Sequence, residues 1–179
     1  MKRHCRYILT ALFVCITSCT SWQDAACHLD VEPSVFPDYK DVTVPCNIAP
    51  LNFMLEEADR IQASFITEGC TPLNVTGNDG VISIPEKDWR KMLMQAKGRK
   101  VQVEISAWTE EFPSGVSYEP FTFNVSADEI DPYISYRLIE PGYVGWRQLG
   151  IYQRNLASFE ESALVTNRES NTTCLNCHH

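Results

Sequence analysis

The sequence has no apolar run long enough to serve as a permanent membrane span. Its longest apolar stretch, residues 7–16, is shorter than the roughly 20 residues that a helix needs to cross a hydrocarbon core. Three basic side chains precede this stretch, and small or hydroxyl-bearing residues follow it, which is how secretory signals are organised. We therefore expect residues 1–18 to be a signal peptide that is removed rather than folded.

Basic residues are also few. The chain has 15 Lys and Arg against 23 Asp and Glu, a net charge of −8. Removing residues 1–18 takes away Lys2, Arg3 and Arg6 and no acid, so the mature chain has 12 basic against 23 acidic residues and a net charge of −11. This charge argues against nucleic acid or an anionic lipid surface as a partner, because both attract basic surfaces.

The familiar signatures of hydrolases and nucleotide-binding enzymes are missing. The sequence has no lipase-type G-x-S-x-G, no H-E-x-x-H and no phosphate-binding loop. We therefore expect no enzymatic activity. The five cysteines that follow Cys19 are an odd number, which argues against a complete disulfide framework.

Cys19 is the candidate lipidation site. Ile16 stands three positions before it, and the hydroxyl residues Thr17 and Ser18 lie between, as in signals of lipoproteins. Two or three acyl chains would hold the protein on a membrane, since each buried methylene contributes about 0.8 kcal/mol. We expect a lipid anchor on the periplasmic side of the outer membrane, with residues 19–36 as a tether. The alternative is an ordinary signal peptide with a cysteine there by chance.

The middle of the chain predicts short strands at residues 42–44, 51–55, 61–66, 81–84, 101–108 and 121–125. The clearest is 101–107, where Val101, Val103 and Ile105 alternate with polar residues, the period-2 pattern of a half-buried strand. One helix is expected between Pro85 and Gly98. We predict a mainly β fold, an immunoglobulin-like β-sandwich with one inserted helix, over residues 37–127.

Residues 128–179 differ from the sandwich in being rich in aromatic residues and glycine. We expect an irregular segment, with a possible strand pair at residues 134–139 and 151–156. A row of aromatic rings could form a sugar-binding platform, but a satellite cluster that packs onto the sandwich is the more ordinary interpretation.

The chain ends in a C-x-x-C-H motif formed by Cys174, Cys177 and His178. Two thiols at this spacing can reach the two vinyl groups of one haem, and the adjacent histidine can bind the iron. The motif therefore predicts covalent haem c, attached outside the cytoplasm. The alternatives are coincidence, a Cys174–Cys177 thiol or disulfide pair, and a zinc site that takes His178 or His179 and a fourth ligand such as His28.

A haem at this motif needs apolar walls and often has a second axial ligand. The sequence offers five candidates for that ligand: His28, His179, Met54, Met92 and Met94. Both Met92 and Met94 are more simply explained as core or surface residues. The walls would have to come from the aromatic-rich segment or from residues beyond His179.

Several blocks resemble a family of Gram-negative envelope lipoproteins, usually described as TolB-like propeller or cytochrome c biosynthesis proteins. The blocks that carry the resemblance are residues 37–45, 47–53, 130–133, 136–143, 150–156 and 174–178. The resemblance covers most of the mature chain. It implies an envelope location, and it implies that this chain is the front of a larger protein in which a β-propeller follows the motif.

Two functions follow as hypotheses. The first is a membrane-anchored lipoprotein that carries haem c at Cys174, Cys177 and His178 and transfers electrons. The second is a haem-free binding or scaffold module that docks an envelope protein partner.

Overall fold

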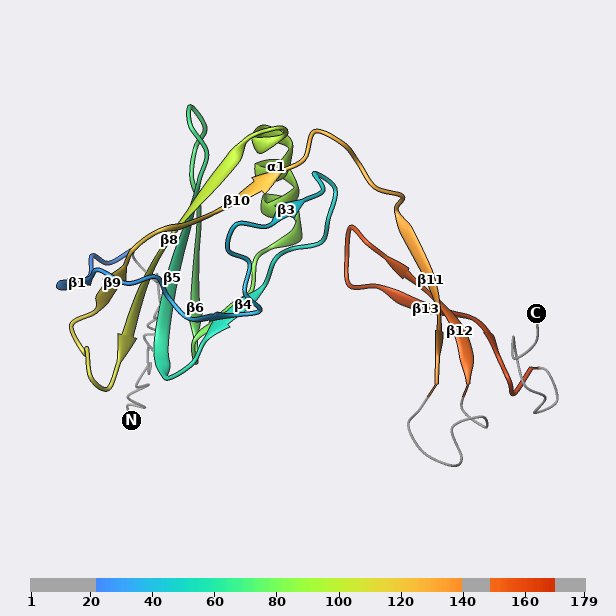
Figure 1. Ribbon diagram of the computed structural model, residues 1–179. Coiled ribbons are helices and arrows are strands. Elements are labelled where there is room, and N and C mark those ends of the chain that lie inside the picture. The colour runs from blue at the N-terminus through green and yellow to red at the C-terminus, as the bar shows by residue number, and fades with distance from the viewer. Residues whose placement is uncertain (1–21, 140–148, 170–179) are drawn as a thin grey trace, which may run out of the picture.

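The computed structural model describes residues 22–139 and 149–169, and these are mainly β with a single helix (Figure 1). The predicted fold class is therefore confirmed. The described residues form one seven-stranded sheet and two three-stranded sheets. They include no helix with the length and apolar character needed to cross a bilayer.

The strands of the large sheet are β1 (Cys27–Leu29), β3 (Thr43–Val44), β5 (Ala58–Ile66), β6 (Leu73–Asn78), β8 (Lys100–Thr109), β9 (Val116–Tyr118) and β10 (Phe121–Val125). A smaller sheet consists of β2 (Val35–Phe36), β4 (Phe53–Leu55) and β7 (Val81–Ile82). The third sheet, called the side sheet below, consists of β11 (Tyr133–Leu138), β12 (Gly150–Asn155) and β13 (Glu161–Thr166).

Strand β8 is the centre of the large sheet. It pairs with β5 along most of its length and, on its other side, with β10 near its start and β9 near its end, all antiparallel. The alternation predicted for this strand is confirmed, because Val101, Val103 and Ile105 are at most 2% exposed while Glu104 is exposed. Strands β1 and β3 then add in parallel to β9 and β10.

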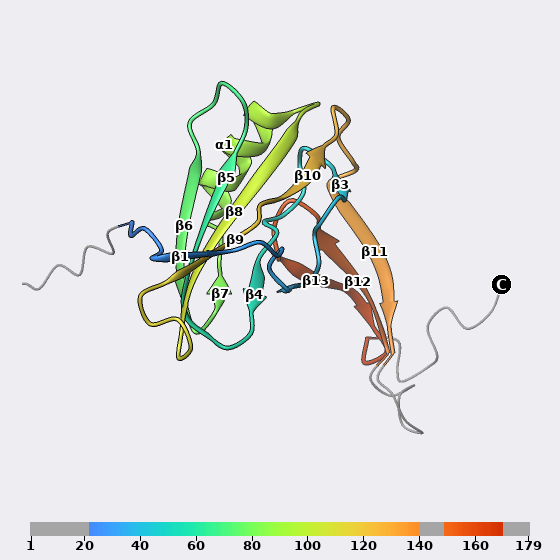
Figure 2. The ribbon, with the colours of Figure 1, turned by 60° about the vertical axis from the view of Figure 1, so that its left-hand side comes forward.

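Helix α1 (Glu86–Ala96) covers one face of the large sheet (Figure 2) and confirms the predicted helix. Pro85 stands at its N-cap and Gly98, with φ of 73°, follows its C-cap. Its buried residue Trp89 lies against Phe65 of β5 and Phe123 of β10, at ring-centre distances of 5.9 and 6.1 Å. Aromatic packing of this kind stabilises a core beyond the area that it buries.

Two regions differ from the sequence prediction. The expected tether over residues 19–36 contains β1 and β2, and β1 is part of the large sheet from Cys27 onward. The segment after residue 127, expected to be irregular, contains the side sheet. The strand pair predicted there is confirmed as β11 and β12, and β13 is an additional strand.

Candidate functional site

The residues predicted to carry lipid and haem, Cys19, Cys174, Cys177 and His178, lie outside the described residues. The described residues nearest to the motif are 167–169, the turn that follows β13. The register pairs Leu138 with Gly150 and Gly150 with Thr166, so the chain leaves β13 at the end of the side sheet where β11 also ends. This end of the side sheet is therefore the described surface closest in sequence to the motif.

One face of the side sheet has apolar and aromatic side chains next to the charged residues Arg154 and Glu161, which are opposite each other in the register of β12 and β13. Cross-strand pairing puts Ile134, Tyr136 and Leu138 of β11 on the same face as Tyr152 of β12. The rings of Tyr136 and Tyr152 stack at 6.3 Å between centres, and the Tyr136 hydroxyl donates to the Glu161 carboxylate. Ile134 and Leu138 are 48% and 44% exposed, so no described layer covers this face, which we call the open face.

Gly150 extends the open face toward the end of β11. A Cβ at this position would lie 2.7 Å from Cε2 of the Tyr152 ring, closer than real Cβ contacts allow. The ring of Tyr152 therefore leans over the Gly150 backbone. The two tyrosines and this glycine are therefore neighbours on the open face, with Leu138 directly opposite Gly150.

The aromatic residues of this region do not join the main core. The buried core cluster consists of residues up to Val125, and no described residue after it is a member. Tyr133 and Phe159 are about half exposed, and the guanidinium of Arg154 lies 6.0 Å from the Phe159 ring centre. The expected satellite cluster packed onto the sandwich is therefore not what the described residues form.

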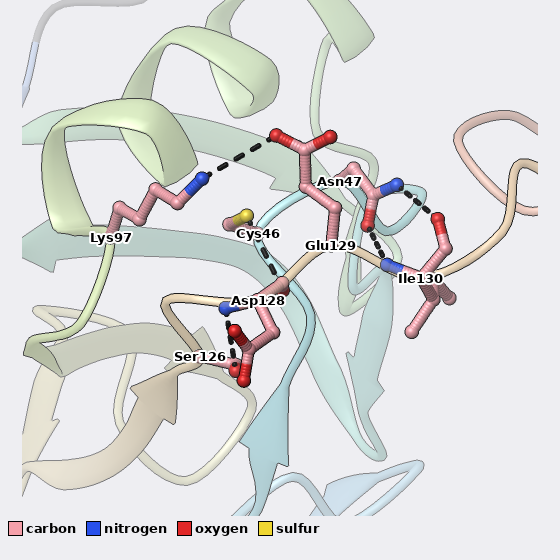
Figure 3. Close-up of polar contacts among 7 residues, drawn as sticks. All are labelled: Cys46, Asn47, Lys97, Ser126, Asp128, Glu129 and Ile130. Atoms are coloured by element: carbon pink, nitrogen blue, oxygen red, sulfur yellow. Dashed lines mark hydrogen bonds and ion pairs between the residues drawn. The ribbon is translucent and has the colours of Figure 1, made fainter.

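The side sheet is joined to the sandwich through four consecutive residues, 46–49, which we call the junction loop. The Cys46 thiol donates to the Asp128 carbonyl at 3.5 Å. The Asn47 amide donates to the Ile130 carbonyl at 2.7 Å and accepts from the Ile130 N–H at 3.1 Å (Figure 3). These bonds fix the segment that leads into β11.

The other two residues of the junction loop extend the connection in both directions. The Ile48 carbonyl accepts from Nε1 of the buried Trp89 at 3.0 Å, which ties the loop to α1. The Ala49 N–H donates to the Leu156 carbonyl at 2.7 Å, just after β12. The core tryptophan and the side sheet are thus connected through a single peptide group, the one between Ile48 and Ala49.

An ion pair lies beside the junction loop. Nζ of Lys97 is 3.4 Å from a Glu129 carboxylate oxygen (Figure 3). The pKa of Lys97 is raised, first by the charge interaction with Cys46 and then by the hydrogen bond and charge of Glu129. Both side chains of the ion pair are substantially exposed, so we assign it little stability.

The described candidates for a second axial ligand do not gather at the side sheet. Both Met92 and Met94 belong to α1. Met92 is on its buried face, which packs against the core, and Met94 is exposed on its outer face. Met54 is in β4, and His28 is in β1, on the side of the sandwich away from the side sheet in Figure 1. The remaining candidate, His179, lies outside the described residues.

Two surface features were not predicted from the sequence. A hollow of about 750 Å³ has Phe112 and Tyr118 in its wall. It is also lined by carboxylates from the β4–β5 turn, the start of β5 and the β8–β9 turn: Glu56, Glu57, Asp59, Glu110 and Glu111. The second feature is the group His28, Asp30 and Glu119, whose side-chain ligand atoms converge. No sequence signal links these three residues, because the parallel pairing of β1 with β9 brings them together.

Comparison of the sequence with models of known families and with curated proteins finds no match. The inferences about function therefore depend on the residues and contacts of the chain itself.

Proposed function

We propose that this protein is a membrane-anchored envelope lipoprotein that carries a covalent haem c on Cys174 and Cys177, with His178 as the proximal iron ligand. Its role is electron transfer, as the haem-bearing front of a larger propeller protein. The observation that carries the proposal is the open face of the side sheet, an uncovered apolar and aromatic surface on the element that leads directly into the motif.

Chain length supports this placement. Four residues lie between Glu169, the last described residue, and Cys174, and the five Cα–Cα steps span at most about 18 Å when the chain is extended. A six-residue strand such as β11 is about 20 Å long. The motif is therefore within reach of the open face.

The chemistry of the open face fits a haem. A haem needs apolar walls, and Ile134 and Leu138 supply aliphatic side chains beside the stacked tyrosine rings. Bound haem would supply one-electron redox chemistry. The protein residues would hold the macrocycle, exclude water from one side of it and set the orientation of the proximal histidine.

The anchor places the sandwich near the membrane. Strand β1 begins at Cys27, eight residues after Cys19, and eight extended residues span at most about 29 Å. We expect globomycin-type inhibition of the lipoprotein signal peptidase, or Cys19→Ala, to leave an unprocessed or soluble form. Unchanged membrane fractionation of Cys19→Ala would show that the anchor assignment is wrong.

The haem assignment is tested by expressing the full chain in the periplasm together with a c-type maturation system. A haemochrome assay and haem staining after denaturing electrophoresis should show one covalent haem per chain. Cys174→Ser and Cys177→Ser should each lower or abolish the signal, whereas Cys70→Ser, at a free cysteine outside the motif, should retain it. Absence of covalent haem from the wild-type protein would contradict the proposal.

A second variant set tests the role of the open face. Leu138→Glu places a charge on the proposed haem wall, at a position that is already 44% exposed, so folding should be retained. We expect reduced haem yield, or a changed reduction potential, with an unchanged circular dichroism spectrum. Ser135→Glu, on the opposite face of the same strand, is the matched control.

The alternative function is a haem-free binding or scaffold module of an envelope complex. The exposed apolar side chains Ile134, Leu138 and Leu164 on the side sheet favour it, because uncovered apolar patches are typical of protein-binding surfaces. A haem-negative protein whose partner binding is lost in Leu138→Glu would support this function. Zinc analysis and thiol titration of the same protein would separate the zinc and disulfide interpretations of the motif.

A further inference from the structure

The edge formed by β1 and β9 aligns four polar side chains. Parallel pairing sets His28 opposite Ser117, and the N–H of Glu119 donates to the Val31 carbonyl at 3.0 Å, so the pairing continues past both strands. Because side chains alternate along a strand, His28 and Asp30 share the face on which Ser117 and Glu119 lie. The backbone, rather than flexible side chains alone, thus brings the group together.

The side chains of this group converge on one nitrogen. Nε2 of His28 lies 3.2 Å from Oε1 of Glu119 and 3.6 Å from Oδ1 of Asp30. One ligand atom from each of the three residues lies within 4.8 Å of the other two. This is the spacing expected of atoms that share a small cation.

Ser117 fixes the tautomer of neutral His28. The nitrogen that carries the lone pair is then Nε2, which faces the carboxylates. The Ser117 hydroxyl donates to the Cys27 carbonyl at 3.2 Å, so its proton is already used. Its oxygen, 3.1 Å from Nδ1 of His28, must therefore accept from an Nδ1–H. Neutral His28 is then protonated at Nδ1, and Nε2 directs a lone pair toward two carboxylates that are themselves acceptors.

When His28 is charged, its Nε2–H donates to the Glu119 carboxylate at 3.2 Å. When His28 is neutral and protonated at Nδ1, the three converging acceptors have no proton between them, and a bound cation takes the place of that proton. In zinc sites the metal–ligand distances are about 2.0 to 2.2 Å, which puts neighbouring tetrahedral ligands about 3.4 Å apart. The two distances from His28, 3.2 and 3.6 Å, are close to this value, and the two carboxylate oxygens lie within 4.8 Å of each other. A hydrogen bond that fixes the other ring nitrogen is also what metal-binding histidines have.

We propose that His28, Asp30 and Glu119 bind a divalent transition-metal ion of the zinc type, with Ser117 as the residue that positions the imidazole. One imidazole and two carboxylates form a ligand set suited to zinc, whereas calcium and magnesium prefer oxygen ligands alone. The three side chains are exposed, which leaves coordination positions for water or for a group of a partner. This site is separate from the C-terminal motif and does not depend on its function.

The site is tested by zinc titration of the mature protein in which Cys174 and Cys177 are both serine, so that the terminal motif cannot bind the ion. Excess Mg²⁺ in the buffer suppresses loose binding to the acidic hollow. We expect one zinc ion per chain by calorimetry, and a shift of the His28 ring nitrogens by NMR in which the Nδ1–H is retained. Equal competition by Mg²⁺ would overturn the proposal.

Single variants separate ligands from the general negative charge. His28→Ala, Asp30→Asn and Glu119→Gln should each weaken zinc affinity at least about tenfold, and Ser117→Ala by about 10- to 100-fold. Asp24→Asn removes one exposed carboxylate from the same N-terminal segment and should leave the affinity unchanged. Because these side chains are exposed, or half-buried in the case of Ser117, circular dichroism should be unaltered. Undiminished zinc binding by folded His28→Ala would show that the proposed site is wrong.

Discussion

The junction loop should determine the stability of the side sheet separately from that of the sandwich. Asn47→Ala removes both hydrogen bonds to Ile130 while leaving the core untouched. A hydrogen bond contributes about 0.5 to 1.5 kcal/mol net, so the two together contribute about 1 to 3 kcal/mol, toward the lower end because Asn47 is only half-buried. Native-state hydrogen exchange should show this loss as faster exchange at the side sheet, by about 5- to 150-fold.

Two backbone amides are suitable reporters of this change. The Ala49 N–H donates to Leu156, and the Leu156 N–H donates to Pro132 at 2.8 Å, so both report contacts of the side sheet. Amides of β5, inside the large sheet, should exchange at nearly unchanged rates. Asn78→Ala, at an exposed asparagine of β6, is the matched control. Equal acceleration in β5 and the side sheet, or none in either, would refute the assignment of this local role.

Three further predictions concern the sandwich. Trp89→Ala should lower the free energy of unfolding by about 3 to 5 kcal/mol in a denaturant titration, because Trp89 is 1% exposed and its ring contacts two aromatic rings. In the same titration, Met94→Ala on the outer face of α1 should change this free energy by less than about 0.5 kcal/mol. Ile105→Asp should abolish cooperative unfolding or strongly lower the thermal midpoint, since a buried unpaired charge costs several kcal/mol. Glu104→Ala, at the neighbouring exposed position, should have neither effect. The pKa of Tyr118 is raised above 10.0, first by burial and then by Glu111. The tyrosine therefore ionises in the unfolded chain before it ionises in the folded protein, and stability falls as pH rises past 10.0. In Tyr118→Phe this alkaline fall of the thermal midpoint should be smaller, and an identical fall would contradict the assignment.

The fold was predictable where the side-chain pattern alone determines the element. Strand β8 alternates over its length, and α1 has a proline at its start, a glycine after its end and apolar residues at helical spacing. Strand β6 was missed because three of its six residues, Asn74, Gly77 and Asn78, are disfavoured in strands and interrupt the short run of Val75 and Thr76. Its stability comes from pairing with β5 on one side, which the sequence of β6 does not record.

The site residues were less predictable, for a related reason. The sequence singled out His28 only as a further ligand for haem or zinc at the terminal motif. Residues 20–30 show no apolar periodicity, so no strand was predicted around it. Its neighbours in the structure come from a strand about 90 positions away, through a parallel pairing only three residues long. Such non-local contacts have no local signal. The junction loop is similar, because nothing in the residues Cys46 and Asn47 themselves points to Asp128 and Ile130.

The arrangement of the chain assigns the junction loop a role in the proposed electron transfer. If Cys19 is lipidated, the chain runs from the anchor into the sandwich at β1 and reaches the motif only after residues 126–132 and the side sheet. The contacts of residues 46–49 hold this connection in one geometry. If haem is attached at Cys174 and Cys177, loosening the loop by Asn47→Ala should leave haem content unchanged. It should instead widen the range of haem positions relative to the membrane, because attachment depends on the motif while position depends on the junction.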